Sequence, residues 1–154
     1  MVQQINAVVG QRGRLTAKEV VLSLPLSGLV LVNDGDAVVR TTDGKSVTAV
    51  ASATPTRFGV VVRHGVGKTG KNAAGKEAYK AGDMLPVMFE GAIWVKPSAP
   101  ITDITAAVYV KTANGTGGAP LGSLSSTATD GIPGAAWESI TGADGLALLN
   151  LRGA

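Results

Sequence analysis

The chain has 154 residues, 45% of them hydrophobic and 16% charged, so it is long and apolar enough for one globular domain rather than a disordered segment. Its net charge of +3 is too small to indicate a nucleic acid partner, which normally needs a concentrated basic face. The absence of cysteine excludes disulfides, thiol nucleophiles and cysteine-based metal sites. No apolar run approaches the roughly 20 residues of a membrane helix, and the N-terminus lacks a signal-peptide pattern, so no membrane partner is expected.

The N-terminal residues 1–15 predict an extended arm, followed by a single β domain over residues 16–154. The arm is rich in Gln, Asn, Gly and Arg, and its cations are Arg12 and Arg14. Such a segment has few apolar side chains to bury. It is therefore either a loosely held terminus or an arm that docks on a neighbouring molecule.

Short aliphatic and β-branched runs between turn signals predict strands along the rest of the chain. The turn signals Asn33–Asp36 and Gly142–Gly145 predict hairpins, and a further turn is expected at Asp43-Gly44. Gly59 inside a strand indicates a bulge or a close backbone approach. We predict an all-β fold, either a small β-barrel or a jelly-roll-like sandwich of short antiparallel strands. The expected strands are Lys18–Leu24, Leu29–Val32, Ala37–Arg40, Val47–Val50, Arg57–Arg63, Ala106–Lys111, Trp137–Ile140 and Leu146–Leu151.

The segment around which the rest is organised contains two apolar runs, Met84–Phe89 and Ala92–Val95, separated by Glu90-Gly91. Two strand-like runs with so short a connection predict a β-hairpin with a two-residue loop. In that register Met88 would lie opposite Ile93, and both faces of the hairpin would be mostly apolar. One face would go to the core, and the other would need a second sheet, a loop or another subunit.

Large apolar side chains in this segment are candidate interface residues. Met and Trp are enriched where subunits meet, so Met84, Met88 and Trp94 predict a homo-oligomer contact. Trp94 and Trp137 are the only tryptophans of a chain that is only 4% aromatic. Each is expected in the core rather than on a ligand platform.

Residues 64–76 predict a mobile basic loop, because they are rich in Gly and contain Lys68 and Lys71. Gly67-Lys68-Thr69 matches the end of a phosphate-binding loop. However, that motif needs glycine where this chain has Val62, and a poor helix start follows it, so nucleotide binding is rejected.

Little in the sequence indicates catalysis. His64 is the only histidine, it has no acidic neighbour in the sequence, and no GxSxG nucleophile motif is present. We interpret His64 as a solvated loop residue. The chain is expected not to be an enzyme and to bind no cofactor or metal.

Four runs resemble the structural cement proteins of tailed phages, which decorate the outer shell of the head: RFGVVVRHG, YKAGDMLPVMFEGAIWV, ITDITAAVYVK and WESITGADGLALLNL. They extend from about Phe58 to the C-terminus. Gly82-Asp83 before an apolar strand, Gly91 before an aromatic-aliphatic strand, and Gly145–Leu148 match the family pattern. Ile104–Ala107 departs from it, since the family often has Gly-Asp ahead of the next strand.

The resemblance implies a small β-barrel or jelly-roll-like domain that self-associates as a dimer or trimer and clamps neighbouring major capsid proteins. The protein would be made in the host cytoplasm and act on the outer surface of the virion capsid. The hairpin would supply apolar contacts, and Arg12, Arg14, Lys68 and Lys71 would pair with acidic residues of the capsid protein. A carbohydrate-binding module or a head-fibre base is the alternative, with Trp94 and Trp137 as sugar platforms, and an enzyme is the distant third.

Overall fold

The computed structural model describes residues 8–13, 19–28, 31–50, 57–72, 74–110, 124–125 and 135–152. All regular structure within these residues is β, as predicted, and they include no helix that could cross a membrane. The strands are β1 (Val20–Pro25), β2 (Ala37–Arg40), β3 (Val47–Ala49), β4 (Phe58–Val61), β5 (Gly70–Lys71), β6 (Glu77–Ala78), β7 (Met84–Val95), β8 (Tyr109–Val110), β9 (Leu124–Ser125), β10 (Ala135–Trp137) and β11 (Ala147–Arg152).

The main sheet is antiparallel and has the strand order β10-β11-β7-β4-β2-β3, with β1 also paired to β7. Two small sheets, β5-β6 and β8-β9, lie beside it. A parallel bridge between Leu26 and Val47 brings the end of β1 close to β3, so the upper part of the sheet curls. No ladder closes the ring among the described strands. The architecture is therefore sandwich-like rather than a closed barrel.

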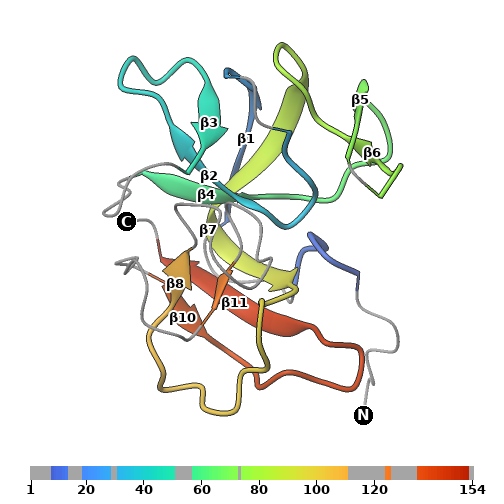
Figure 1. Ribbon diagram of the computed structural model, residues 1–154. Helices are drawn as coiled ribbons and strands as arrows, with labels where there is room; N and C mark the ends of the chain where they lie inside the picture. The colour runs from blue at the N-terminus through green and yellow to red at the C-terminus, as the bar shows by residue number, and fades with distance from the viewer. Residues whose placement is uncertain are drawn as a thin grey trace.

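Strand β7 runs through the whole molecule and joins an upper group of strands to a lower one (Figure 1). It is one continuous strand, so the predicted hairpin at Glu90-Gly91 is wrong. Its first half pairs with β1 and β4, and its second half pairs with β11. The register shifts between Val20 and Val21, which leaves Phe89 as a bulged residue of β7, and Gly91 has a φ of 127°. These residues bend the strand instead of reversing it.

The two faces of the sheet bury two separate hydrophobic cores. The upper core consists of Leu26, Val32, Val38, Val47, Val61, Tyr79, Leu85 and Val87. The lower core consists of Ala37, Val50, Phe58, Val60, Val62, Met88, Ile93, Val95, Ile101, Val108, Val110, Leu124, Trp137, Ala147, Leu149 and Leu151. Both faces of β7 are thus covered from within the chain. The second apolar face does not need another subunit, and residues of β8, β9 and the segment before them supply the opposite layer.

Local predictions near the turns are partly confirmed. Trp137 pairs with Leu149 in the expected last hairpin, although β10 ends where the predicted strand begins. The turn at Asp43-Gly44 joins β2 to β3. Gly59 does mark a close approach, since a Cβ there would lie 2.5 Å from Val87 Cγ1.

The hairpin expected around Asn33–Asp36 is wrong. Val32 bridges Tyr79, while β2 pairs with β3 and β4. The turn itself is present, because the Asp36 amide donates to the Asn33 carbonyl. Leu29 and Val30 lie outside the described residues, and the division at residues 15 and 16 stays a prediction.

Candidate functional site

The three candidate residues of β7 lie in different surroundings. Met88 is fully buried in the lower core, so its side chain has no surface to offer a partner. Met84 is 54% exposed at the start of the strand, and Trp94 is half-buried near its end. Because β7 is 12 residues long, Met84 and Trp94 do not form one patch.

Met84 has an exposed apolar neighbour in the chain that follows β4. A Cβ on Gly67 would lie 3.5 Å from the Met84 carbonyl oxygen, and the adjacent Val66 is 68% exposed. We call Met84 and Val66 the apolar tip. Val66 carries no signal in the sequence, because a single valine among glycines and lysines resembles any loop residue.

Part of the N-terminal arm is fastened to its own domain. The Gly10 amide donates to the Trp94 carbonyl, the Trp94 amide donates to the Gln11 carbonyl, and the Gly13 amide donates to the Ala92 carbonyl, over 2.7–2.8 Å. The Arg63 amide donates to the Gly10 carbonyl at 2.7 Å. Residues 10–13 therefore extend the main sheet along the second half of β7.

The two arginines predicted as contacts in the arm differ in what the structure shows. Arg12 is exposed and forms an ion pair of 2.9 Å with Glu19, which contributes little to stability in water. Arg14 lies outside the described residues.

Lys68 is largely covered and paired within its own domain, and so is not a free cation. Its Nζ lies 2.8 Å from Asp34 Oδ2, donates to the His64 carbonyl at 2.9 Å, and sits 5.4 Å from the centre of the Tyr79 ring. The side chain is only 13% exposed. Asn72 Nδ2 also donates to Asn33 Oδ1 at 2.9 Å. Residues 64–76, predicted as a mobile basic loop, thus include β5 and are tied to the Asn33–Asp36 turn through Lys68 and Asn72, and their mobility stays a prediction.

Two side chains in or beside this turn, Asp36 and Tyr79, have shifted pKa values. Burial raises the pKa of Asp36 to about 6, although hydrogen bonds from the Asn33 amide and side chain oppose that shift. Burial, with a smaller contribution from the Asp34 and Asp83 charges, raises the pKa of Tyr79 to about 12. Both groups lie where the hairpin meets the sheet.

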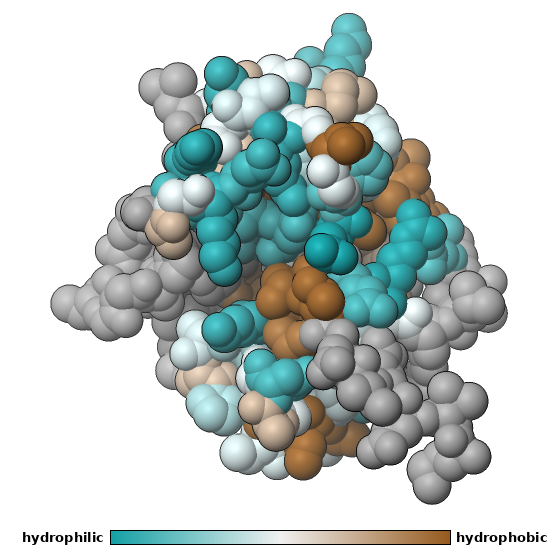
Figure 2. All heavy atoms as spheres, turned by 90° about the vertical axis from the view of Figure 1, so that its right-hand side faces the viewer, coloured by the Kyte–Doolittle hydropathy of each residue, from teal (hydrophilic) through white to brown (hydrophobic). Residues whose placement is uncertain are grey.

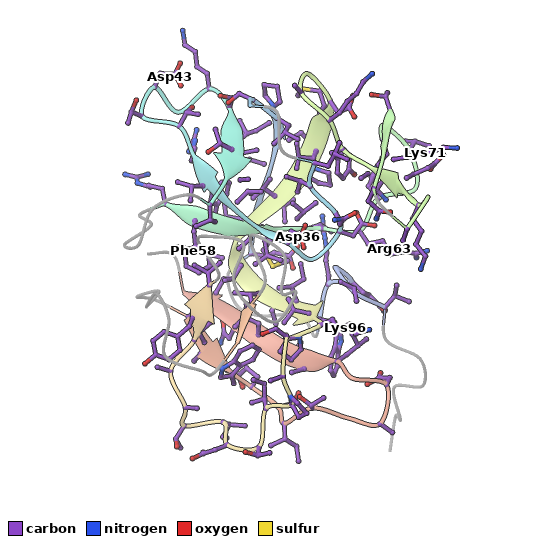
Figure 3. The ribbon with its side chains drawn as sticks, in the orientation of Figure 1. Asp36, Asp43, Phe58, Arg63, Lys71 and Lys96 are labelled. Carbon is purple, nitrogen blue, oxygen red and sulfur yellow. The ribbon has the colours of Figure 1, made fainter. Side chains whose placement is uncertain are left out.

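Three exposed cations lie along one side of the molecule. Arg63, Lys71 and Lys96 are on the right-hand side in Figure 3. Seen from that side, hydrophilic side chains surround a central group of apolar atoms (Figure 2). We call these three residues the basic face. Lys71 was predicted as a contact, whereas Arg63 and Lys96 were missed, since a cation after a strand carries no specific signal.

His64 and Trp137 bear on the predicted alternatives of catalysis and sugar binding, and the role of the half-buried Trp94 as a sugar platform stays a prediction. His64 is exposed, with Nδ1 3.0 Å from the Val66 carbonyl oxygen. In the part of the chain that the structure describes, no three His, Cys, Asp or Glu side chains could hold a metal ion. Trp137 is 3% exposed in the lower core, so it cannot stack on a sugar ring.

Comparisons with known proteins give two similarities. The model of the family described as "Structural cement protein (E217 gp24/Pam3 gp6)" matches residues 3–152, and so includes the first half of the chain. A chain from a structure titled "The capsid of Myoviridae Phage XM1" has a TM-score of 0.67 and 18% sequence identity, over 99% of this chain and 94% of that one. At this identity the likeness shows a shared fold. No curated protein matches.

Proposed function

Since the chain belongs to the structural cement protein family and so has a capsid cement role, we propose that it binds the outer surface of a phage head and stabilises contacts between neighbouring major capsid proteins. The virion capsid is its place of action. Host-cytoplasmic synthesis and the outer-surface position belong to this proposal.

The basic face is the observation that carries the proposed attachment. Arg63, Lys71 and Lys96 are exposed, and none of them forms an ion pair with another residue in the described ranges. Cations positioned in or just after strands fit acidic residues of a capsid protein, because complementary charge guides docking and fixes orientation. Arg12 would add charge from the arm, and a contact through Arg14 stays a prediction.

The energy of attachment comes from many weak contacts. An exposed ion pair contributes only about 0–1 kcal/mol, so the basic face alone gives a modest, salt-sensitive affinity per copy. Apolar contacts add to it, for example through Val8, which is 40% exposed two residues before Gly10. Repetition of the same contact over a symmetric shell supplies the rest through avidity.

The test uses phage heads assembled without this protein. Added protein should bind them and raise the temperature at which they release DNA, and cryo-electron microscopy should place its density outside the shell. The triple variant Arg63→Glu, Lys71→Glu, Lys96→Glu should bind much more weakly. The single variant Lys71→Glu is compared with the control Lys45→Glu, which makes the same charge change elsewhere. Lys45 is also exposed but lies in the distant β2–β3 turn. Heads that bind no protein, or density inside the shell, would refute the proposal.

Self-association as a dimer or trimer and the lack of catalytic activity are further parts of the proposal. The apolar tip supports self-association, since two exposed apolar side chains at one end of the molecule favour burial against a second copy. The solvated His64 supports a purely structural role. A hydrolase activity on peptidoglycan or polysaccharide that disappears in His64→Ala would overturn that role.

A further inference from the structure

A groove with two arginines lies at the bulge between β1 and β7, apart from the residues of the basic face. Its volume is about 450 Å³, and it is lined by Val20, Leu22, Arg40, Arg57, Phe58, Phe89 and Glu90. A second hollow of about 370 Å³ adjoins it and shares Arg40 and Arg57. Because the two hollows share the arginine pair, we treat them as one site, which we call the arginine groove.

The two arginines are positioned by the backbone. The Arg40 amide donates to the Arg57 carbonyl at 3.1 Å, so the two residues are neighbours across the sheet. Arg40 is further held by a hydrogen bond from Nε to the Gly44 carbonyl at 2.9 Å and by its position 5.9 Å above the Phe89 ring. That bond leaves the two terminal nitrogens of Arg40 without an ion pair or hydrogen bond among the described residues.

Arg57 has an unusual backbone conformation. Its φ is 56°, the only positive value among the described residues other than glycine. L-residues rarely adopt this region, where glycine is favoured. Within the described ranges its exposed side chain forms no hydrogen bond or ion pair. An exposed arginine in a backbone conformation that favours glycine, with no hydrogen bond or ion pair to the described residues, is suited to binding a partner.

We propose that the arginine groove binds an extended acidic peptide segment of a neighbouring capsid subunit, with a carboxylate on the arginines and an aliphatic side chain on the apolar floor. This proposal rests on the proposed cement function in one respect, namely that the peptide belongs to a capsid protein. Arginine binds carboxylates through two parallel N–H bonds, and Val20, Leu22 and Phe89 provide the floor. Peptides offer both groups at the alternating spacing of an extended chain.

The lining also disfavours a uniformly anionic ligand. Glu90 lies in the groove, and Asp43 lies in the adjoining hollow, where it accepts hydrogen bonds from Thr41 Oγ1 and the Lys45 amide. A nucleic acid backbone would bring phosphates against both carboxylates, with a repulsive cost. An acidic peptide places one charge at the arginines and keeps uncharged atoms elsewhere.

The first experiment is a titration followed by NMR of the whole protein. The probe is the capped peptide Leu-Asp-Leu-Glu-Leu, with Leu-Asn-Leu-Gln-Leu as its neutral match and inorganic pyrophosphate as the third arm. The acidic peptide should shift the signals of Arg40, Arg57 and Phe89, and the neutral one should not. Arg57→Gly should weaken the acidic peptide by about tenfold, the usual worth of one charge-assisted hydrogen-bonded contact. Its thermal midpoint should be unchanged or higher, because glycine relieves the positive φ.

The second experiment separates this inference from the proposed function. Heads lacking the protein are titrated with the wild type, Arg57→Gly and the control Lys45→Ala, which removes one positive charge from a side chain that lines neither hollow. Arg57→Gly should bind heads about tenfold more weakly, and Lys45→Ala should bind normally. If the wild type binds heads and Arg57→Gly binds them with the same affinity, the proposed role of the groove is refuted and the cement function is not. If the wild type does not bind heads, the proposed cement function is refuted. The peptide titration then decides by itself whether the groove binds acidic peptides. No shift with the acidic peptide, or tighter binding of pyrophosphate, overturns the proposed role of the groove.

Discussion

Met88 and Ile93 lie five residues apart in one strand, yet both side chains are buried in the same lower core. In a regular strand, residues an odd number apart point to opposite faces. The bulge at Phe89 and the φ of 127° at Gly91 reverse this alternation between them. Leu85 and Val87 therefore belong to the upper core, while Met88, Ile93 and Val95 belong to the lower one. A single strand thus links the two cores.

Gly91→Ala should destabilise the fold by roughly 1–3 kcal/mol. A Cβ at Gly91 would lie 3.0 Å from Met88 Sδ, and the backbone conformation itself disfavours alanine. Chemical denaturation measures the change. Gly82→Ala is the matched control, since its φ is 92° and nothing lies within 4 Å of its Cβ, so it isolates the backbone cost. Equal losses in the two variants would mean that the contact with Met88 is unimportant.

Lys68→Met should destabilise the protein by about 1–3 kcal/mol, because it leaves the Asp34 carboxylate partly buried without its partner. The double variant Lys68→Met, Asp34→Asn should recover most of that loss. Lys71→Met is the control, since Lys71 is exposed. Urea unfolding of all four proteins tests this. If Lys68→Met is as stable as Lys71→Met, the ion pair between Lys68 and Asp34 does not stabilise the fold.

The pH dependence of stability should reveal Asp36. Its pKa is about 6 in the fold against 3.8 in the unfolded chain, so the folded state binds this proton more tightly. The resulting stabilisation is complete below pH 3.8 and is lost as the pH rises through about 6. Asp36→Asn, which keeps an oxygen to accept from the Asn33 amide, should be more stable than the wild type above pH 6, by at most roughly 3 kcal/mol.

The midpoints of the two proteins should converge below pH 4 when thermal unfolding is followed from pH 3 to 8. Hydrogen bonds from Thr41 and Thr105 lower the pKa of the exposed Asp43 and Asp103, and those groups act in the opposite direction. They are present in both proteins and cancel in the difference. A difference that does not change with pH would contradict the raised pKa of Asp36.

Met84→Asp and Met88→Asp should fail in different ways. Met84 is 54% exposed, so its variant should keep its stability and lose self-association. Met88 is buried, so its variant should unfold, because a charge in the lower core has no partner. Mass photometry and circular dichroism separate these effects. A wild type that is monomeric at micromolar concentration would sink the proposed oligomer.

Hydrogen exchange should protect the inner part of the arm in the free protein. The amides of Gly10, Gly13 and Trp94 are all bonded within the extended sheet. Protection comparable to that of β11 is expected before any capsid is added. Exchange as fast as in an unfolded chain would show that residues 10–13 dock only on a partner.

The all-β class, the final hairpin and the close approach at Gly59 could be predicted from the amino-acid sequence alone. Those features follow from alternation, turn residues and a missing side chain, which act over a few neighbouring residues. The sequence also identified the segment from Met84 to Val95 as the centre of the fold and the family through its strand and glycine pattern. The apolar character of both faces was correct too.

The partners that cover those two faces follow from how distant segments pack together. Glu90-Gly91 suits a tight turn or a bend equally well, and the choice fell to a bend because β1, β4 and β11 offer partners along the whole length of β7. Lys68 forms an ion pair because the fold brings Asp34, which is 34 residues away in the sequence, beside it. Arg40 and Arg57 became neighbours through the β2–β4 pairing. Contacts between distant residues depend on the pairing of whole strands, and a sequence pattern that acts locally does not fix that pairing.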